Sequence, residues 1–186
     1  AALLVTPYYN KPTQAGLLSH YTEIANEVDL PQILYNVPGR TGCDLLSETV
    51  NALSTHPNII GLKDATGDLG RLAEIKNLLG DRFLDGSFSL YSGDDPSATQ
   101  FILEGGSGTI SVTANVVPDR ISEICRLASE NNLEAIEMDQ ELTELNAVLF
   151  IESNPIPVKW ALHRLGRIPG GMRLPMTTLD KKYHNQ

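Results

Sequence analysis

Lys63 is the residue whose type and place in this sequence most clearly indicate a chemical role. It follows Ile59-Ile60-Gly61-Leu62, so it ends a run that is otherwise apolar. Burial disfavours the charged ammonium, lowers the pKa of a lysine and leaves a neutral amine that can attack a ketone to form a Schiff base. The structural alternative is a lysine whose ammonium reaches solvent or pairs with Asp64. The run by itself leaves both interpretations open.

Tyr35 and Arg40 follow another apolar run. A phenol at position 35 can relay protons during imine formation, although a single tyrosine in such a place often only packs. Arg40 stands in the segment Pro38-Gly39-Arg40-Thr41-Gly42. The proline restricts the backbone before Arg40, and the glycines on either side of the arginine allow backbone conformations that other residues avoid. Such a segment is suited to presenting a guanidinium to a carboxylate. An ordinary surface arginine explains Arg40 equally well.

Two further pairs of adjacent residues are candidates for a functional role. Tyr8 and Tyr9 stand together after Pro7 in a chain with six tyrosines, a pattern typical of interface or rim packing that does not exclude function. Asp94 and Asp95 are more typical of a helix start than of a metal site, because a proline and a helical pattern follow them. We therefore assign no metal to this pair.

Alternating strands and helices are predicted to position these residues. Apolar or β-branched runs predict five strands, at 2–6, 32–37, 59–63, 87–92 and 109–113. Apolar residues at helical spacing predict helices between them, at 14–27, 46–54, 69–79 and 98–103. Such alternation predicts a parallel sheet, whose carboxyl end would gather Lys63, Tyr35 and Arg40. Three more helices are predicted beyond the sheet, at 120–130, 133–150 and 158–165.

Two architectures accept repeated strand-helix units, an open doubly wound sheet and a closed eight-stranded barrel. Five strands taken alone favour the open sheet. A barrel at roughly 30 residues per unit needs about 240 residues, so this chain would lack three units. The apolar start at Ala1 and the polar end at Gln186 both suggest a chain cut within its structure. Composition does not decide between the two architectures.

Charge and cysteine content exclude several classes of function. The 186 residues carry a net charge of -9, which repels phosphate backbones and anionic lipid heads. We therefore expect no nucleic-acid partner, and no apolar run is long enough to cross a membrane. The two cysteines, Cys43 and Cys125, lie far apart and indicate neither a disulfide framework nor a zinc site. A reducing cytoplasm fits this composition best.

Four motifs together resemble the dihydrodipicolinate synthase family, part of the pyruvate-dependent Schiff-base aldolase superfamily. They are Val5-Thr6-Pro7-Tyr8-Tyr9-Asn10-Lys11-Pro12, Leu34-Tyr35-Asn36-Val37-Pro38-Gly39-Arg40-Thr41-Gly42, Ile60-Gly61-Leu62-Lys63-Asp64-Ala65-Thr66-Gly67 and Asn154-Pro155-Ile156-Pro157-Val158-Lys159. The resemblance runs from Ala1 to about Thr177. It implies a (β/α)8 TIM barrel, with strands 4 to 8 in residues 1–117. Residues 118–186 would then form the last barrel helix and a truncated C-terminal helical extension.

The resemblance also implies a lyase that needs no cofactor. Members condense pyruvate with aspartate semialdehyde to 4-hydroxy-tetrahydrodipicolinate, on the way to diaminopimelate and lysine. Lys63 would form the Schiff base, Tyr35 would relay protons and Arg40 would hold the semialdehyde carboxylate. The remaining roles implied are a relay tyrosine lent to the neighbouring subunit at Tyr9, pocket lining at Gly93 and Ile110, and an effector or interface position at Tyr8. A homotetramer built from two dimers is implied as well.

Two other functions stay open at this point. Sialic-acid lyases and keto-deoxy-sugar aldolases share the tyrosine and the lysine, so Arg40 is the discriminating residue, because a carboxylate needs a fixed cation and a sugar needs hydroxyl partners. A non-catalytic binding or regulatory remnant of the family is the second alternative.

The chain departs from the family pattern in two places. The Gly-Thr-Thr-Gly-Glu stretch expected on an early strand is absent, and with it the relay threonine and the partners of the pyruvate carboxylate. We therefore expect the 186 residues alone to be inactive and poorly folded. Residues 83–88 form a segment a few residues longer than is usual, which we expect to be a loop at the end of the sheet away from Lys63.

Overall fold

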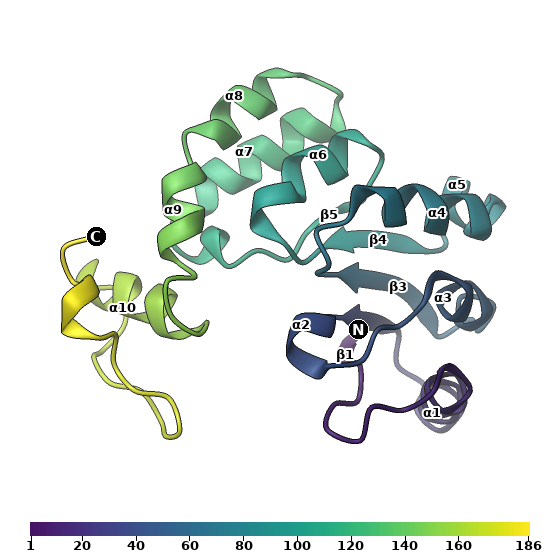
Figure 1. The fold of residues 1–186 in the computed structure, drawn as a ribbon. Helices are drawn as coiled ribbons and strands as arrows, with labels where there is room; N and C mark the ends of the chain where they lie inside the picture. Colours follow the sequence, from purple (N-terminus) through teal and green to yellow (C-terminus); the bar gives the residue numbers. More distant parts are fainter. The chain divides into compact units, whose positions relative to one another are not determined.

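Five parallel strands form one sheet in the order β1-β2-β3-β4-β5 (Figure 1). The computed structural model describes all 186 residues, in two compact units, Ala1–Ile110 and Ser111–Gln186. The sheet belongs to the first unit, and its strands are β1 (Ala2–Val5), β2 (Gln32–Asn36), β3 (Ile59–Asp64), β4 (Ser89–Ser92) and β5 (Gly108–Thr109). The predicted α/β class and the parallel sheet are confirmed.

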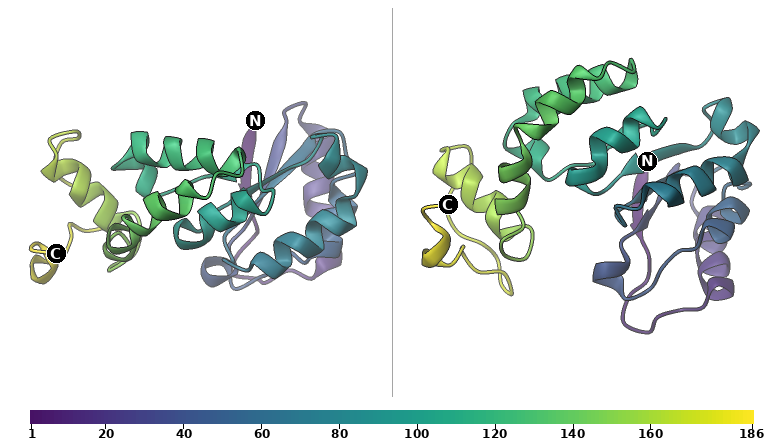
Figure 2. Two further views of the ribbon diagram at one scale, coloured as in Figure 1. Left: turned by 90° about the horizontal axis from the view of Figure 1, so that it is seen from above. Right: turned by 45° about the horizontal axis from the view of Figure 1, so that its top comes forward.

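The helices of the first unit connect consecutive strands. They are α1 (Gln14–Glu27), α2 (Pro38–Thr41), α3 (Ser47–Leu53), α4 (Leu69–Leu79), α5 (Asp81–Leu84) and α6 (Ala98–Leu103), with a 3-10 turn η1 (Asp95–Ser97) before α6. Helices α1, α3 and α4 lie side by side along one face of the sheet (Figures 1 and 2). Side chains at helical spacing, such as Leu17, Tyr21 and Ala25 of α1, bury that face in a single apolar core.

Cross-strand register divides the sheet residues between its two faces. Leu4, Leu34, Leu62 and Leu90 pair in one row across β1 to β4, and all four belong to or pack against the apolar core under the helices. The next row pairs Val5, Tyr35, Lys63 and Tyr91. Because successive side chains of a strand point to opposite faces, this second row lies on the face away from the helices.

A bulge in β3 sets which row Lys63 joins. Gln32 of β2 pairs with Ile59, but the next residue, Ile33, pairs with Gly61, so Ile60 is an extra residue. Ile59 and Leu62 both lie in the helix-facing core, although an odd separation of three residues would place them on opposite faces of a regular strand. The bulge therefore directs Lys63 away from the helices.

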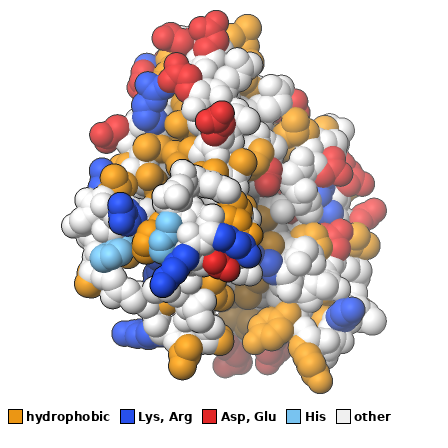
Figure 3. All heavy atoms as spheres, turned by 60° about the vertical axis from the view of Figure 1, so that its left-hand side comes forward, with side chains coloured by type: hydrophobic (Ala, Val, Ile, Leu, Met, Phe, Trp, Pro, Cys, Tyr) orange, Lys and Arg blue, Asp and Glu red, His pale blue; other side chains and the backbone are white.

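The second unit is helical. It contains a 3-10 turn η2 (Thr113–Asn115), helices α7 (Pro118–Ser129), α8 (Glu134–Gln140), α9 (Thr143–Val148) and α10 (Ile156–Arg164), and a final 3-10 turn η3 (Lys181–Tyr183). Acidic side chains gather where α7 and α8 lie, and Lys, Arg and His side chains gather around α10 and the segment that follows it (Figure 3). Residues 154–186 contain six Lys or Arg and one Asp, so this acidic chain has a basic end.

The predicted fifth strand, 109–113, is wrong beyond Thr109. The Ser111 hydroxyl accepts a hydrogen bond from the backbone N–H of Ala114 at 2.9 Å, and the side-chain amide of Asn115 donates to the Val112 carbonyl at 3.0 Å. These local bonds compete with a strand ladder, and the chain turns into η2 instead.

The predicted single helix 133–150 is also wrong, because α8 ends at Gln140 and α9 begins at Thr143. Leu142 lies in a 3-10-type turn, in which its N–H donates to the Asp139 carbonyl at 2.9 Å, and its side chain is buried. Burial of this leucine accompanies the break, whereas periodicity alone continues through it.

The segment predicted as a loop at 83–88 is partly helical. Helix α5 ends at Leu84, and the following turn enters β4 at its amino end. This is the end of the sheet opposite Lys63, as expected from the sequence.

No helix of the structure combines the length and apolar character needed to span a membrane.

Gly61→Ala is expected to lower the free energy of unfolding by about 1–3 kcal/mol, as overpacking of a close-packed site does. A Cβ at Gly61 would lie 2.7 Å from the backbone carbonyl oxygen of Ser89, which cannot move without disturbing β4. Urea unfolding measures the change. Gly39→Ala is the control, since a Cβ there meets nothing within 4 Å. Equal stability of the two variants would contradict the close approach of β3 and β4.

Candidate active site

Hydrogen bonds continue past the ends of the strands and fix the segments that carry the candidate residues. The N–H of Thr6 donates to the Tyr35 carbonyl at 2.9 Å, and the N–H of Gly93 donates to the Asp64 carbonyl at 2.7 Å. The N–H of Ile110 donates to the Ser92 carbonyl at 2.9 Å in the same way. The carboxyl end of the sheet is thus ordered for at least one residue beyond most of its strands.

Lys63 is buried at this end of the sheet, with 9% of its surface exposed. Its Nζ atom lies 4.3 Å from the centroid of the Tyr35 ring. Burial lowers the pKa of the lysine; the negative charge of Asp95 opposes this effect and the positive charge of Arg40 adds to it. The structural alternative of a pair with Asp64 does not occur, because Asp64 follows Lys63 on the strand and lies on the helix-facing side.

Gly93 provides the space that the lysine occupies. A Cβ at this position would lie 2.6 Å from Cε of Lys63 and 2.8 Å from Cβ of Ala65. Any larger residue would have to displace the lysine side chain. Ile110, on the neighbouring strand end, is 39% exposed. Two residues predicted to line a pocket therefore lie at the same end of the sheet as Lys63.

Tyr35 and Arg40 form the other side of the site. Burial raises the pKa of the Tyr35 phenol, and the charge of Arg40 partly offsets this rise, so the phenol holds its proton at neutral pH. Arg40 lies in the one-turn helix α2, which Pro38 begins and Gly42 ends with a left-handed φ of 66°. The Thr41 hydroxyl donates to the carbonyls of Val37 and Cys43, which tightens this turn.

Tyr8 and Tyr9 are not brought together with Lys63. They are 68% and 92% exposed in the segment after β1. Tyr9 has a positive φ of 61°, and the N–H of Asn10 donates to the Tyr8 carbonyl at 2.7 Å across it. The tight turn holds both rings in solvent.

Four polar residues behind the site were missed at the sequence level. Asn36, Asp44, Asp64 and Arg71 form a connected set of hydrogen bonds and ion pairs on the helix-facing side of the sheet. Asn36 and Asp64 each follow a candidate residue directly, so strand alternation was the available signal that both would lie on the other face.

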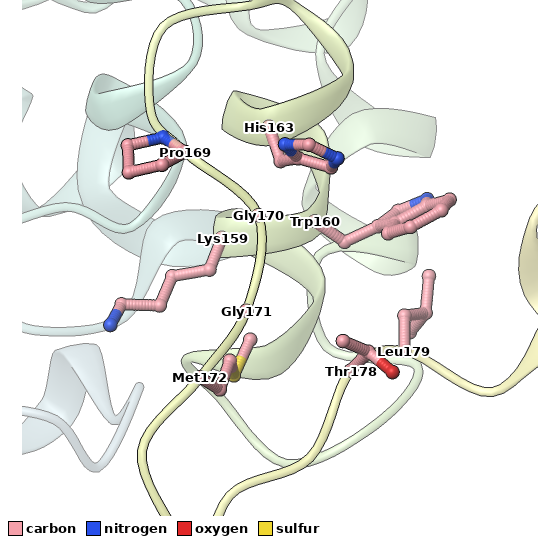
Figure 4. Close-up of a pocket in the computed structure, with 9 residues that line it drawn as sticks. All are labelled: Lys159, Trp160, His163, Pro169, Gly170, Gly171, Met172, Thr178 and Leu179. Atoms are coloured by element: carbon pink, nitrogen blue, oxygen red, sulfur yellow. The ribbon is translucent and has the colours of Figure 1, made fainter.

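The pocket drawn in Figure 4 lies elsewhere, in the second unit, and has a volume of about 90 Å³. Lys159, Trp160 and His163 of α10 line it together with the Pro169-Gly170-Gly171 segment. None of the residues predicted for the active site lines it. No group of three or more His, Cys, Asp or Glu side chains is arranged to hold a metal ion.

Lys63→Met is expected to raise the free energy of unfolding at pH 7, because the folded protein then no longer buries an ammonium. The folded-state pKa of Lys63 is lowered, so the cost of burial is present below that pKa and disappears as the pH rises toward the ordinary lysine value. The advantage of the variant should therefore shrink between pH 7 and pH 10 in urea unfolding experiments.

Lys181→Met, which replaces an exposed lysine, is the control and should change the free energy of unfolding little. A stability difference for Lys63→Met that stays constant with pH would contradict the burial of a charge.

Comparison with known proteins gives a consistent result over the whole chain. Residues 1–186 match the family described as the Dihydrodipicolinate synthetase family. The chain is 56% identical over 185 residues to the 4-hydroxy-tetrahydrodipicolinate synthase of Pseudomonas savastanoi pv. phaseolicola, covering 99% of this chain and 62% of the relative. It is 57% identical over 180 residues to the protein of the same name from Methylococcus capsulatus, covering 96% of this chain and 60% of the relative.

Solved structures agree with the sequence relatives. A dihydrodipicolinate synthase from Acinetobacter baumannii complexed with pyruvate superposes with a TM-score of 0.93 at 50% identity, covering 99% of this chain and 62% of that one. The Aquifex aeolicus dihydrodipicolinate synthase gives a TM-score of 0.93 at 42% identity, covering 98% of this chain and 61% of that one. The chain spans about 62% of the length of such relatives. It belongs to the dihydrodipicolinate synthetase family.

Proposed function

We propose that the protein containing this chain is a lyase that condenses pyruvate with aspartate semialdehyde through a Schiff base on Lys63. The product would be 4-hydroxy-tetrahydrodipicolinate, in the diaminopimelate and lysine pathway. The observation that carries the proposal is a buried lysine of lowered pKa beside a protonated tyrosine at the carboxyl end of a parallel sheet. Relatives named 4-hydroxy-tetrahydrodipicolinate synthase, more than half identical to the chain, support it.

Lys63 supplies the nucleophile. Its neutral Nζ attacks the ketone carbon of pyruvate, the carbonyl oxygen takes up protons and leaves as water, and an imine remains. Loss of a methyl proton gives an enamine, whose carbon forms the new bond to the aldehyde carbon of the second substrate. The amine of that substrate then displaces Lys63, which closes the ring and regenerates the enzyme. A lowered pKa makes the first step feasible near neutral pH.

Tyr35 is proposed to move the protons of these steps. Its phenol keeps its proton because burial raises its pKa, so it can donate to the departing oxygen and take the proton back later. The 4.3 Å distance from Lys63 Nζ to the Tyr35 ring brings the phenol close to the reacting carbon.

Arg40 is proposed to bind the carboxylate of the semialdehyde. Its charge acts on both Lys63 and Tyr35, so the guanidinium lies within electrostatic range of the reacting amine. A fixed cation at this place favours a carboxylate-bearing aldehyde over a sugar substrate, whose hydroxyl groups need other partners. Gly93 and Ile110 are proposed to line the pyruvate pocket.

Tyr9 is proposed to complete the proton relay of a neighbouring subunit, and Tyr8 to lie at the same interface or at an effector site. Their exposure of 92% and 68% and the rigid turn that holds them support a role outside their own subunit. The assembly we propose is a homotetramer of two dimers, in the cytoplasm.

The five strands are proposed to be strands 4 to 8 of a (β/α)8 barrel. The high TM-scores over about 62% of the relatives' length support this assignment. Residues 1–117 would contribute these strands, and residues 118–186 the last barrel helix and a C-terminal helical extension. The row of Val5, Tyr35, Lys63 and Tyr91 would then face the barrel interior.

Pyruvate followed by borohydride should attach a stable label to Lys63 in the active protein, because reduction traps the imine. Peptide mass mapping identifies the labelled residue. Lys11 and Lys159 are internal controls in the same digest and should stay unlabelled. A label on either of them, or an active enzyme without any label, would falsify the mechanism.

Arg40→Ala should raise KM for the semialdehyde and lower kcat/KM by about 10- to 100-fold, the usual cost of losing a charge-assisted contact. Pyruvate trapping should change little, because the guanidinium is assigned to the second substrate. Arg40→Lys keeps the charge without the planar guanidinium, so its kcat/KM for the semialdehyde should lie between those of wild type and Arg40→Ala. Loss of trapping with unchanged semialdehyde kinetics would reverse the assignment.

A further inference from the structure

A buried polar network lies behind the candidate active site. The side-chain amide of Asn36 donates to Oδ1 of Asp44 at 2.7 Å and to Oδ1 of Asp64 at 3.0 Å. The Asn36 carbonyl oxygen accepts the backbone N–H of Leu45 at 3.0 Å. Asn36 directly follows Tyr35, and Asp64 directly follows Lys63. The network thus begins one residue beyond the two central residues of the site.

Arg71, in the first turn of α4, joins the parts of this network. Its side chain is 10% exposed, with Nη1 3.3 Å from Oδ2 of Asp44 and Nε 3.5 Å from Oδ2 of Asp64. Its Nη2 also donates to the backbone carbonyl of Leu45. Asp68 caps α4 by accepting the N–H of Gly70, which holds the first turn in place. One guanidinium therefore ties the end of β3 to the Asp44-Leu45 segment.

The segment held in this way carries Arg40. Residues 37–44 leave the sheet after Asn36 and return to it at Asp44, so we refer to them as the Arg40 loop. Asn36 binds both the Asp44 side chain and the backbone of the next residue, which closes the base of the loop. Internal bonds of Thr41 stiffen the loop itself. A stiff loop moves as one body, so the position of its base determines the position of the guanidinium of Arg40.

The charges of the network make Arg71 necessary for this closure. Asp44 and Asp64 both bind the same amide group of Asn36, so their carboxylates lie close together. Burial raises the pKa of Asp64, and its bonds from Thr66 and Asn36 and the charge of Arg71 oppose the rise. Removal of the guanidinium would leave two neighbouring carboxylates that repel each other, one of them buried at Asp64 and the other 39% exposed at Asp44. Movement of the loop base away from β3 relieves that repulsion.

We propose that Arg71 is a positioning residue for the second substrate, which it affects by fixing the Arg40 loop against the end of β3. This inference rests on the proposed function, because it assigns the semialdehyde carboxylate to Arg40. Arg71 itself lies on the helix-facing side of the sheet and touches no substrate. Its effect should therefore appear in semialdehyde use and not in imine formation with pyruvate.

The test compares Arg71→Met with wild type in a condensation assay and in borohydride trapping. We expect KM for the semialdehyde to rise about tenfold or more, since small displacements of a binding group have effects of this size. The trapping rate should stay within about threefold. Arg71→Lys keeps the positive charge but cannot make all three contacts, so it should give a smaller rise in the KM for the semialdehyde. If Arg71→Met folds poorly, Arg71→Lys takes its place in the comparison. Thermal unfolding of each variant separates a loss of fold from a loss of position.

A matched control and a double variant isolate the route of the effect. Arg82→Met removes another partly buried arginine of the helical layer, whose Nη2 donates to Oδ1 of Asn51 at 2.7 Å. This variant should leave the KM for the semialdehyde unchanged. In the Arg40→Ala background, Arg71→Met should cause no further loss of semialdehyde use, because residues that act through one contact are not additive.

Three results would overturn the inference. These are full additivity of the two substitutions, a fall in trapping equal to the fall in condensation, and an equal KM effect of Arg82→Met. Failure of wild type to trap pyruvate or to condense the substrates would instead refute the proposed function, and the wild-type arms report this separately.

Discussion

The extra residue in β3 is the constraint on which the rest of the site depends. Without the bulge at Ile60, strict alternation would put Lys63 on the same face as Ile59, in the apolar core under α1, α3 and α4. The bulge reverses the order, so Lys63 joins Tyr35 on the free face and Asp64 turns toward the helices. One local irregularity thus separates the amine of Lys63 from the carboxylate that follows it.

Separation of the two residues gives Lys63 and Asp64 different surroundings on the two faces of the sheet. On the free face, Lys63 meets a tyrosine ring, the space left by Gly93 and the opposing charges of Asp95 and Arg40. Burial beside these neighbours lowers the pKa of the amine. On the other face, Asp64 enters a network that holds the Arg40 loop. The proposed chemistry and the proposed positioning would therefore share one strand but use its opposite faces.

Sequence patterns predicted the elements that rest on local signals. The bounds of α1, α4 and α6 agree with the predicted helices, since Thr13 and Asp68 cap the first two and apolar spacing defines the third. The fifth strand and the long helix at 133–150 failed because local hydrogen bonds of Ser111 and burial of Leu142 compete with periodicity. The bulge could not be predicted, because it arises from pairing between strands that are distant in sequence.

For the candidate site, too, the parts set by local sequence signals could be predicted and the parts set by contacts between distant residues could not. Lys63, Tyr35 and Gly93 come together because they end parallel strands, which a strand-helix repeat predicts. The network of Arg71 was not predicted, since it joins a helix to a loop across 27 residues of sequence and no pattern of spacing marks it.

A titration of Lys63 tests the central claim most directly, namely that this lysine is a desolvated amine. Lysine labelled with ¹³C at Cε gives one NMR signal per residue, and the signal of Lys63 is assigned by its loss in Lys63→Met. The account predicts that this signal titrates at a lower pH than the ordinary lysine value. Titration of Lys63 at or above the ordinary lysine value would contradict it.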